Sequence, residues 1–492
     1  MKILLIRPPM TLLRNEIKSV VFPLGLAYIA ARLEKEGHQI EVLDAVVLGQ
    51  DSQIEREGML HFGLDWSEIS KRIAFSNPKV IGISCMFSSQ SNNAYKIAEL
   101  AKKWNPKIPV IFGGAHPSSV PEEVLSRPEV DYIILGEGEE SIVQLVNCIS
   151  NNNFDVLAEV EGVGMKLGNS LKINPKINFI AGIDQIPFPA RHLFPMELYF
   201  KSEFGHGSDL ISPPLSSMIT SRGCPYHCVY CSVHTVWGRN YRPRSPKNVA
   251  DEIEVLVKEY GVKEIHFEDD NLTLKKERMI DICREIISRR LKFRWTTPNG
   301  VALWTLDAEV LGWMKKAGCY KLCFGIESGD PETQKFIRKH IPLDKCKEVV
   351  KEANKLGIWT HGFFIIGFPF EEMKSINNTL SYAIESDLDF ASFFLATPYP
   401  KTDLYTIMQE NGLVGHLTWE SLRVSAGSIN TKHFTAEELQ EIQKKMFKKF
   451  VLHRALSMLN PIKLSYRLKR LKKIEDWRFV ARFGKRFLQI TK

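Results

Sequence analysis

Short apolar runs alternate with longer amphipathic segments over the first 150 residues. Continuous apolar runs are typical of strands buried on both faces, whereas apolar residues at helical spacing predict helices. The strand-bearing segments are 2–9, 79–89, 109–119 and 130–146, together with a helix followed by a strand in 23–45. Repeated alternation of strand and helix predicts an α/β fold with a doubly wound, Rossmann-like parallel sheet.

Unusual residues gather where these predicted strands end. Ligands of a doubly wound sheet bind outside the carboxyl ends of its strands. Glycines there allow a large flat or phosphate-bearing ligand to approach the backbone closely. The candidate ligand-binding residues are Pro8, Ser84, Gly113, Gly114, His116, Gly136 and Gly138. Two simpler explanations stay open: the glycines only end strands and begin helices, and His116 is an ordinary loop histidine.

A second strand–helix pattern follows a Pro-rich stretch. Its candidate strands lie at 217–222, 263–269, 293–299, 320–328, 359–369 and 388–398. Helices are expected between them at 246–260, 275–290, 307–317, 330–338, 344–356 and 373–386. Six such units predict a partial (β/α)6 barrel with its active site at the carboxyl ends of the strands. The expected domains are therefore 1–150, a linker at 151–215, the barrel at 216–415 and a helical region at 416–492.

Three of the nine cysteines lie in one short stretch, "SRGCPYHCVYC", on the loop after the first barrel strand. Thiolates are soft ligands that select zinc, copper(I) or iron–sulfur clusters. A structural zinc needs a fourth ligand from elsewhere, and a disulfide leaves one cysteine over. A four-iron cluster held by Cys224, Cys228 and Cys231 keeps one iron open for another ligand. Zinc stays open as the alternative, and the other six cysteines are expected to be buried small apolar residues.

The C-x3-C-x2-C spacing, with Tyr230 before the last cysteine, resembles the signature of radical S-adenosylmethionine enzymes. In the first domain, "FPLGLAYIAARLEKEGH", "VIFGGAHPS" and "ILGEGEESI" resemble the cobalamin-binding domain found upstream of many such enzymes. The D-x-H-x-x-G motif, whose histidine ligates cobalt, is absent, so the resemblance leaves the lower cobalt ligand undetermined. It implies a 4Fe–4S cluster, S-adenosylmethionine and cobalamin as cofactors.

The same resemblance implies roles for residues at the ends of the barrel strands. Asp269 or Asp270 would accept hydrogen bonds from the methionyl ammonium group. Glu327 would hold the ribose hydroxyls, and the backbone at Gly367 would lie against adenine. The predicted cofactor-binding set is completed by Tyr230, Thr297 and Asn299, and the predicted catalytic and metal-binding residues are the three clustered cysteines. The alternatives are that the aspartates cap a helix and that Glu327 pairs with a barrel arginine.

The family resemblance implies an enzyme that cleaves S-adenosylmethionine and uses a 5'-deoxyadenosyl radical to take hydrogen from its substrate. Cobalamin beside such a domain implies methyl transfer to an unactivated carbon. The alternatives are an oxidative cyclase, similar to anaerobic magnesium-protoporphyrin ester cyclases, and a non-catalytic metal-binding scaffold that binds nucleic acid through its basic tail. Expected partners are a small-molecule, lipid or tetrapyrrole-like substrate and a reductase, flavodoxin or ferredoxin as electron donor.

Charge changes this picture only near the carboxyl end. The 492 residues carry a formal net charge of +8, but residues 451–492 alone hold 12 Lys or Arg against two acidic residues. A helix is expected over 435–459, with Thr435 and Glu438 as a capping box. Basic helices that also carry Leu, Trp and Phe can lie on anionic membranes or bind a partner. A helical cap on the barrel is the alternative, and the near-neutral remainder does not favour nucleic acid as a partner.

No apolar run reaches transmembrane length. The opening "MKILLIRPP" is expected to be a strand, because it has neither the apolar length nor the cleavage site of a signal peptide. Scattered cysteines do not resemble a disulfide framework. The expected location is therefore the reducing cytoplasm, with peripheral contact between the basic tail and a membrane.

Overall fold

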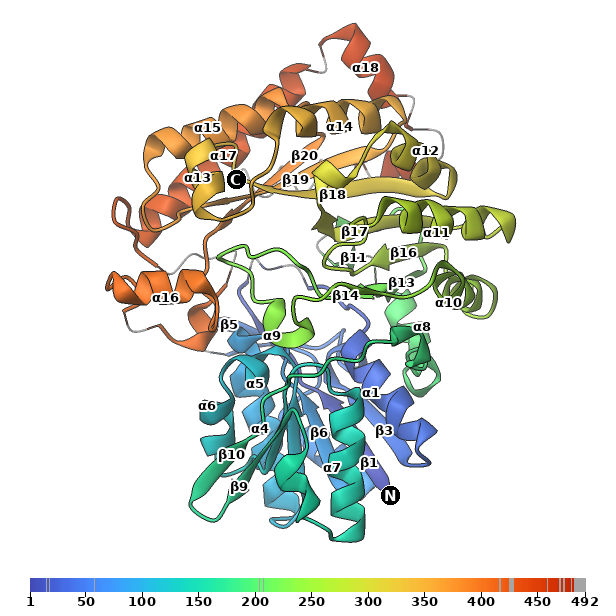
Figure 1. The fold of residues 1–492 in the computed structure, drawn as a ribbon, viewed down its shortest axis with the longest axis vertical. Coiled ribbons are helices and arrows are strands. Elements are labelled where there is room, and N and C mark those ends of the chain that lie inside the picture. Colours follow the sequence, from blue (N-terminus) through green and yellow to red (C-terminus); the bar gives the residue numbers. More distant parts are fainter. Residues whose placement is uncertain are drawn as a thin grey trace. The chain divides into compact units, whose positions relative to one another are not determined.

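The computed structural model describes residues 1–481 apart from 15, 17, 57, 203, 207, 416, 424–428, 458, 469, 472, 473 and 479. The chain divides into two compact units, whose strands and helices are labelled in Figure 1. Unit 1 comprises Met1–Ser202 and Ser232–Arg242, and unit 2 comprises Glu203–Cys231 and Pro243–Lys492. The chain thus enters unit 1 again directly after Cys231, the last of the three clustered cysteines.

The main sheet of unit 1 has seven strands in the order β10-β9-β8-β7-β6-β1-β3. They are β1 (Lys2–Arg7), β3 (Gln39–Asp44), β6 (Val80–Ser84), β7 (Val110–Gly113), β8 (Tyr132–Ile134), β9 (Val163–Leu167) and β10 (Ser170–Ile173). Strands β3, β1, β6, β7 and β8 pair in parallel, which confirms the doubly wound sheet. The direction of winding reverses between β1 and β6, and such a switch point opens a ligand crevice at the carboxyl ends.

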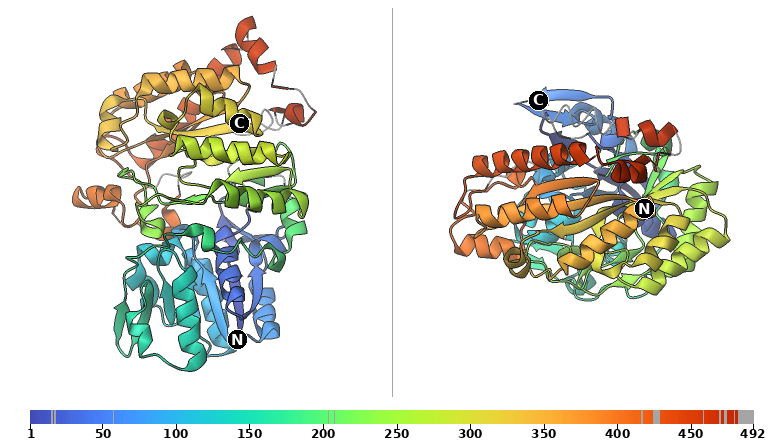
Figure 2. Two further views of the ribbon diagram at one scale, coloured as in Figure 1. Left: turned by 45° about the vertical axis from the view of Figure 1, so that its right-hand side comes forward. Right: turned by 90° about the horizontal axis from the view of Figure 1, so that it is seen from above.

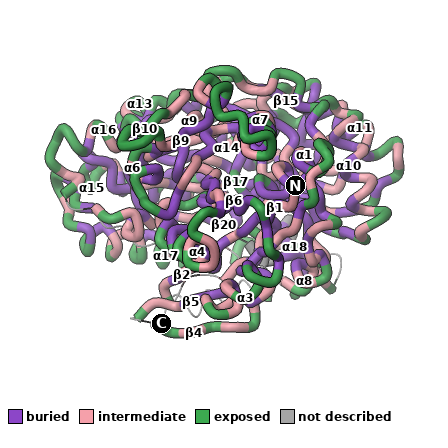
Figure 3. The backbone as a smooth tube through the Cα atoms, turned by 90° about the horizontal axis from the view of Figure 1, so that it is seen from below, coloured by how far each residue is buried: buried purple, intermediate pink, exposed green. Residues whose placement is uncertain are grey.

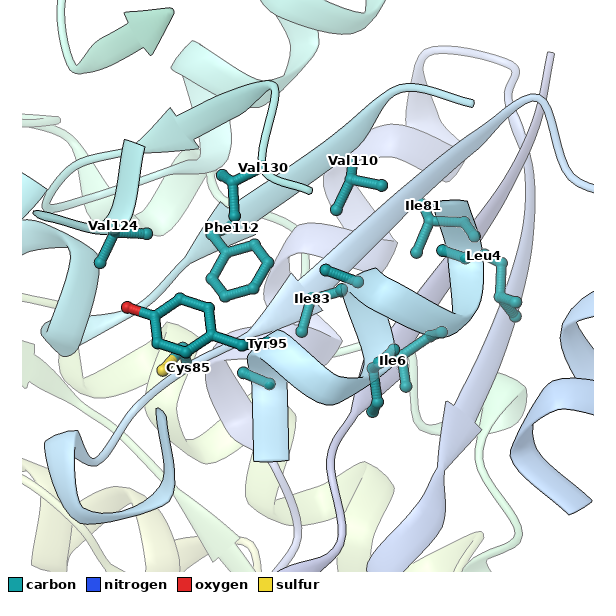
Figure 4. Close-up of a cluster of buried hydrophobic side chains, with 14 of the residues drawn as sticks. Leu4, Ile6, Ile81, Ile83, Cys85, Tyr95, Val110, Phe112, Val124 and Val130 are labelled. Carbon is teal, nitrogen blue, oxygen red and sulfur yellow. The ribbon is translucent and has the colours of Figure 1, made fainter. Parts of the chain in front are cut away.

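Helices cover this sheet because its strands are apolar on both faces. They are α1 (Leu24–Lys35), α2 (Ala45–Leu48), α3 (Trp66–Ser76), α4 (Ser91–Trp104), α5 (Ala115–Ser119), α6 (Pro121–Ser126), α7 (Glu139–Asn151), α8 (Met196–Phe200) and α9 (His234–Trp237), with short 3-10 turns η1 (Ser88–Gln90), η2 (Val156–Glu159), η3 (Ile183–Gln185) and η4 (Arg191–Leu193). Figure 4 shows part of the core, where Ile83 of β6 lies near Phe112 of β7 and Tyr95 of α4, and Ile81 of β6 lies near Val110 of β7. The Tyr95 and Phe112 rings stack with centroids 5.6 Å apart.

Two parts of unit 1 differ from the sequence-based expectation. A small antiparallel sheet of β2 (Met10–Leu12), β5 (Met59–Phe62) and β4 (Gln53–Arg56) was not predicted, because such short strands carry little periodic signal. The hairpin β9–β10 lies in the stretch expected to be a linker, where the sequence has hairpin-like character, but its extension of the main sheet was not predicted. Gly164 allows this packing, since a Cβ there would lie 2.5 Å from Ile133. Unit 1 therefore continues to Ser202 instead of ending near residue 150.

Unit 2 is built on six parallel strands in the order β13-β16-β17-β18-β19-β20. They are β13 (Leu215–Met218), β16 (Glu264–Phe267), β17 (Arg294–Val301), β18 (Cys319–Glu327), β19 (Trp359–Ile366) and β20 (Phe390–Leu395). The connecting helices are α10 (Pro246–Lys258), α11 (Lys276–Ser288), α12 (Ala308–Lys316), α13 (Pro331–Phe336), α14 (Leu343–Lys355) and α15 (Met373–Glu385). Strand order follows the chain, and the right-hand view of Figure 2 shows helices outside the curved sheet, which confirms the partial (β/α)6 barrel.

Shorter elements complete unit 2 and its junctions. They are β11 (Phe204–Gly205), β12 (Ser208–Asp209), β14 (Ser221–Arg222), β15 (Arg242–Pro243), η5 (Leu303–Thr305), α16 (Asp403–Glu410), η6 (Trp419–Ser421), α17 (Ala436–Ser457) and α18 (Pro461–Leu468). The predicted capping box begins α17: the Thr435 N–H donates to Glu438 at 2.8 Å and the Glu438 N–H donates to Thr435 at 3.2 Å. Phe450 of α17 packs edge-on against Phe393 of β20, so this helix covers the barrel. Within the described residues, no helix is long and apolar enough to cross a membrane.

The two faces of the barrel sheet carry different side chains. Phe267 and Trp295 pack against each other on the outer face, where the Trp295 indole donates to the Ala317 carbonyl at the end of α12. Residues that alternate with them lie on the opposite face, called the inner face below. Polar residues on this face include Ser217, Glu264, His266, Glu268, Arg294, Thr296, Lys321, Cys323, His361 and Ser392. Figure 3 shows that strands β17 and β20 are largely buried.

Candidate functional site

The three clustered cysteines lie on the loop after β14, a short strand that begins three residues after the first barrel strand, β13, ends at Met218. Val229, between the second and third cysteine, is buried and anchors this loop. Its N–H donates to the Ile337 carbonyl at 3.2 Å, and its own carbonyl accepts from Leu404 at 2.8 Å. The Cys231 N–H donates to the Cys228 carbonyl at 3.1 Å. These backbone bonds hold the loop so that its cysteine side chains are only half-buried.

The donor set of this loop fits the expected 4Fe–4S cluster. Cys224, Cys228 and Cys231 form no disulfide, and they are the three cysteines of the chain that are not buried. Burial raises the pKa of Cys224 and Cys228, and the nearby Lys339 ammonium acts in the opposite direction. Three thiols beside the Lys339 ammonium fit an anionic 4Fe–4S cluster in which the fourth iron has no protein ligand. Among the described residues, no three His, Cys, Asp or Glu side chains surround a single metal position.

Lys339 connects the cysteine loop with the end of β18. Its ammonium donates to Glu327 Oε1 at 2.6 Å and to the Tyr230 hydroxyl at 3.3 Å. Burial opposes the charge on Lys339, but Glu327 outweighs it, so the pKa of Lys339 is raised. Burial and then Glu327 also raise the pKa of Tyr230. Gly325 leaves room for the pair, because a Cβ there would lie 2.8 Å from Glu327 and 2.9 Å from Lys339.

Glu327 has an unusual backbone conformation, with φ of 68°. Residues other than glycine rarely adopt this left-handed region, and such strain concentrates at functional sites. The register between β18 and β19 shifts at the same point. Such a conformation marks Glu327 as a residue of the functional site.

Glu327 pairs with Lys339, whereas the sequence-based alternative was a pair with a barrel arginine. Lys339 was not predicted, because it lies twelve residues after Glu327 and beyond α13. The available signal was Gly325, since a glycine at this position indicates that other side chains approach the backbone closely.

The two aspartates after β16 have different environments. Asp269 is buried and accepts from the Thr220 N–H at 3.0 Å, the Thr220 hydroxyl at 2.7 Å and the Ser221 hydroxyl. It ties the second barrel strand to the first. Asp270 is half-buried and accepts no hydrogen bond from the described residues. Burial, and then the charge of Asp269, raise the pKa of Asp270 to about 7. Asp270 is therefore the carboxylate still available to a ligand.

Thr297 and Asn299 both lie within β17, which runs two residues beyond its expected end. Thr297 is buried, and its hydroxyl accepts from the Cys323 N–H at 3.4 Å. Asn299 is exposed and donates to the Glu268 carbonyl at 2.8 Å. Thr297 thus bridges strands at an irregular point of the sheet, while Asn299 stays accessible.

Gly367 follows β19 in the left-handed region, with φ of 82°. Its N–H donates to Glu371 Oε2 at 2.7 Å, and the Phe368 N–H donates to the same oxygen at 3.2 Å. Burial raises the pKa of Glu371 to about 7. Glu371 was not predicted, but it shapes the turn in which Gly367 lies.

In unit 1 the predicted crevice lies where β1 and β6 end. Pro8 is buried after β1, and Ser84 is half-buried at the end of β6, opposite Gly113 of β7. Open space surrounds the position that a Cβ would take on Gly113. Two large apolar side chains follow Ser84, Met86 at 52% and Phe87 at 56% exposure. This edge is thus lined by backbone and apolar groups, which fits a large flat cofactor such as cobalamin.

The remaining glycines of unit 1 serve close packing. Gly114 has φ of 116°, and a Cβ there would lie 2.6 Å from the Cys85 carbonyl. A Cβ on Gly136 would lie 3.2 Å from the Val236 carbonyl, and one on Gly138 would meet Ile134 at 3.0 Å. Their absent side chains allow the loops after β6, β7 and β8 to lie close together.

His116 is fully buried between two hydroxyl groups. Its Nε2 lies 3.2 Å from the Tyr95 hydroxyl and its Nδ1 lies 3.0 Å from the Ser88 hydroxyl. Burial lowers the pKa of His116 to about 4. Both ring nitrogens are engaged, so His116 orders the loop behind Gly113 and Gly114 and is not placed as a metal ligand.

Residues 232–242 of unit 1 are fixed by a buried ion pair. One nitrogen of Arg242 lies 2.8 Å from both carboxylate oxygens of Glu137, within the predicted "GEGE" loop. The same nitrogen donates to the Ile180 carbonyl at 2.7 Å, and the other donates to the Trp237 carbonyl at 2.9 Å. The chain directly after the last cysteine is therefore held at the edge of unit 1 that carries Gly136.

Comparison with known families and proteins agrees with this geometry. Residues 10–146 match the B12 binding domain family, and residues 218–383 match the radical SAM superfamily. The protein named "Uncharacterized methyltransferase PH0819" of Pyrococcus horikoshii is 35% identical over 92% of this chain and 93% of its own. Cytidylyl-2-hydroxyethylphosphonate methyltransferase of Streptomyces wedmorensis is 33% identical over 84% and 82%. Anaerobic magnesium-protoporphyrin IX monomethyl ester cyclase of Rubrivivax gelatinosus is 27% identical over 82% and 69%.

Solved structures share the fold. The methyltransferase TsrM from Kitasatospora setae has a TM-score of 0.68 at 19% identity, over 85% of this chain and 79% of its own. The cobalamin-dependent radical enzyme OxsB has a TM-score of 0.71 at 18% identity, over 99% and 75%. With a B12 binding domain, a radical SAM barrel and relatives that match nearly the whole chain, the protein belongs to the cobalamin-dependent radical S-adenosylmethionine enzymes.

Proposed function

We propose that this enzyme transfers a methyl group from S-adenosylmethionine to an unactivated carbon of a small molecule. The observation that carries this proposal is the combination of two sites in one chain. Unit 1 has a glycine-edged switch point at the carboxyl ends of its strands, and unit 2 has three cysteines on the first barrel loop. Two relatives that match most of the chain are methyltransferases by name. When bound, the cluster and cobalamin supply one-electron and methyl-transfer chemistry.

Different residues of unit 2 would bind the cluster and S-adenosylmethionine. Cys224, Cys228 and Cys231 provide the three thiolates. Asp270 accepts hydrogen bonds from the ammonium group, because its neighbour Asp269 is already saturated by Thr220 and Ser221.

The network of Lys339, Glu327 and Tyr230 orients ligand groups beside the cysteine loop. Lys339 is poised to bind a carboxylate, and the second oxygen of Glu327 is available to ribose hydroxyls. Asn299 and the turn at Gly367 complete the proposed cofactor contacts. Thr297 does not contact the cofactor in this proposal; its hydroxyl instead links β17 to β18 and so positions the neighbouring residues.

In unit 1 the crevice holds cobalamin by shape. Gly113 admits the ring, Met86 and Phe87 offer apolar contact, and Pro8 and Ser84 border the same edge. Because His116 is engaged on both nitrogens, we propose that it supports the crevice and leaves the cobalt without a histidine from this position.

The test is an anaerobic reaction of the reconstituted enzyme with cobalamin and S-adenosylmethionine carrying a deuterated methyl group. Formation of trideuteromethylcobalamin, followed by label in a product of an added substrate, is the expected result. Release of 5'-deoxyadenosine without any labelled methyl group on cobalamin or product would contradict the proposal. That outcome would instead favour oxidative cyclisation, a second candidate supported by the related ester cyclases.

The partners follow from the same proposal. An electron donor is required by the enzyme class, and flavodoxin or ferredoxin is the proposed kind. A lipid or tetrapyrrole-like substrate remains worth screening, since cyclase relatives are named for a tetrapyrrole. Exposed Leu452, Leu456 and Leu459 form an apolar stripe on the basic tail, which supports peripheral contact with an anionic membrane. Cosedimentation with phosphatidylglycerol vesicles, lost when these leucines become serine, would test that contact.

A further inference from the structure

Three polar residues of the inner face lie side by side on neighbouring barrel strands. His266 of β16 is in register with Thr296 of β17, and Thr296 is in register with Lys321 of β18. Residues directly opposite each other in paired strands point to the same face. The side chains of His266, Thr296 and Lys321 therefore form one continuous row across three strands.

Each member of this row carries a hydrogen-bonding or charged group that has no partner among the described residues. His266 Nδ1 and Thr296 Oγ1 are buried without a hydrogen-bond partner. Lys321 is only 2% exposed, and its ammonium forms no ion pair with any described carboxylate. An unpaired buried charge costs several kcal/mol, and buried polar groups are nearly always hydrogen-bonded. Three such groups together indicate a missing ligand.

The carboxylates of the inner face do not supply the missing charge, because they are engaged elsewhere. Glu264 lies 3.0 Å from His266 Nε2 and accepts from the Tyr320 hydroxyl at 2.6 Å. Glu268 lies 2.7 Å from His206 and accepts from Ser217 at 3.3 Å. The row is thus positive overall, and its counter-ion has to come from outside the chain.

The surroundings of Lys321 are otherwise neutral. His361 of β19 lies 2.9 Å from the Ser392 hydroxyl, and burial, with the neighbouring Lys321, lowers the pKa of His361 to about 3. Lys321 and Glu327 lie six positions apart on β18, a span of about 20 Å in a strand. Lys321 is therefore well removed from the Glu327–Lys339 pair that serves the cofactor end of the barrel.

We propose that His266, Thr296 and Lys321 bind an oxyanion group of the substrate, namely a carboxylate, phosphonate or phosphate. The inference rests on the proposed function, because it takes the inner face of the barrel as the place where the substrate lies. Lys321 provides one positive charge and Thr296 a hydroxyl donor. His266 contributes as an imidazolium, whose Nε2–H donates to Glu264 while its Nδ1–H donates to the oxyanion. Charge-assisted hydrogen bonds of this kind are the strong ones. The substrate class is thereby narrowed to anionic small molecules.

The experiment uses the full-length enzyme, reconstituted with cluster and cobalamin and saturated with S-adenosylmethionine without a reductant. Saturation keeps the probe away from the cofactor site near Lys339. Methylphosphonate is titrated and followed by phosphorus NMR, with inorganic phosphate and acetate as competitors. We expect saturable binding to wild type, a roughly hundredfold loss in Lys321→Met and a roughly tenfold loss in Thr296→Val. Lys351→Met is the matched control and should bind as wild type, because Lys351 is exposed on the surface of α14.

Thermal unfolding separates this role from a structural one. Lys321→Met and Thr296→Val each remove an unpartnered buried polar group, so both should raise the unfolding midpoint of the protein without probe while they weaken binding. A lower midpoint together with unchanged binding would overturn the proposal, as would absence of saturable binding by wild type. Reduced wild-type enzyme and the control Lys351→Met should both release 5'-deoxyadenosine. Failure of that readout in wild type would contradict the proposed radical chemistry, whereas the binding titration tests the oxyanion site by itself.

Discussion

The carboxyl ends of the two parallel sheets present different chemistry. In unit 1 they offer glycine backbone, Ser84 and the exposed apolar Met86 and Phe87, and His116 is buried and uncharged. In unit 2 they offer thiols, a carboxylate and the Glu327–Lys339 pair. A neutral, shape-defined edge suits a large flat ligand, whereas a charged edge suits a small zwitterion. The contrast implies that the two sites can be disrupted separately.

Removing a thiol should have the largest effect. Cys224→Ala, Cys228→Ala or Cys231→Ala is expected to abolish the iron–sulfur cluster and with it all 5'-deoxyadenosine release, because no described residue beside the loop offers a replacement thiolate. Iron and sulfide analysis with electron paramagnetic resonance measures this. Cobalamin binding, followed by absorbance, should persist because unit 1 is untouched.

Cys346→Ala is the matched control, since this buried cysteine lies on α14. It should keep the cluster. Loss of cobalamin in the three loop variants would show that the two edges are not independent, and a full complement of iron would refute the ligand assignment.

The second prediction concerns the buried pair that holds residues 232–242 within unit 1. Arg242→Met leaves the buried Glu137 carboxylate without its cation, so unit 1 should lose about 3–5 kcal/mol of stability. Amide hydrogen exchange, which resolves the two units, measures the loss. Adding Glu137→Met should recover part of it, because the orphaned charge disappears.

The exposed pair Glu68–Arg72 provides the comparison. Glu68→Ala should cost less than about 1 kcal/mol, as surface ion pairs do. Equal effects at the two pairs would mean that burial does not set the strength of the Arg242 contact.

Much of the fold could be predicted because the periodic signals are strong. Five of the six barrel strands and the five parallel strands of unit 1 lie where their apolar runs indicated. The first barrel strand was expected at 217–222, but it is Leu215–Met218, and Ser221–Arg222 pairs with β15 in a separate sheet. The hairpin β9–β10 was placed in a linker, since its outer strand, Ser170–Ile173, is mostly exposed and only sheet pairing reveals its role. The sheet β2-β5-β4 has three or four residues per strand, too few for a period to show.

The site was predictable where one residue type has one use. Three cysteines on a loop indicate metal chemistry whatever surrounds them. Asp269 and Asp270 could not be told apart, because their difference lies in hydrogen bonds from Thr220 and Ser221, almost fifty residues earlier. Lys339 was missed for the same reason: its partner is defined by the fold and not by sequence spacing.

The third prediction is a difference in acid sensitivity. His116 is buried and its pKa falls to about 4, whereas an unfolded histidine titrates near 6.5. The unfolded state therefore binds more protons between these values, and stability of unit 1 should fall as pH drops from about 6.5 to 4, by about 3 kcal/mol in all.

Hydrogen exchange of unit 1 at pH 7 and pH 5 tests this. His116→Asn should flatten the dependence, at some cost in stability at neutral pH. The exposed His192→Asn should leave it unchanged. An unchanged slope in His116→Asn would place the acid-sensitive group elsewhere.

The smallest effect is expected from Lys339, because its removal leaves the cluster ligands in place. Lys339→Met should weaken S-adenosylmethionine binding about tenfold. The variant removes the ammonium group that donates to Glu327 and to the Tyr230 hydroxyl. Lys339→Arg should recover part of the affinity. Equilibrium binding to the oxidised, cluster-loaded protein measures the effect without turnover, and iron content should stay at the wild-type level. If Lys339→Met lost its iron, the ammonium would be needed to stabilise the anionic cluster itself, and the charged edge of unit 2 would serve metal retention before cofactor orientation.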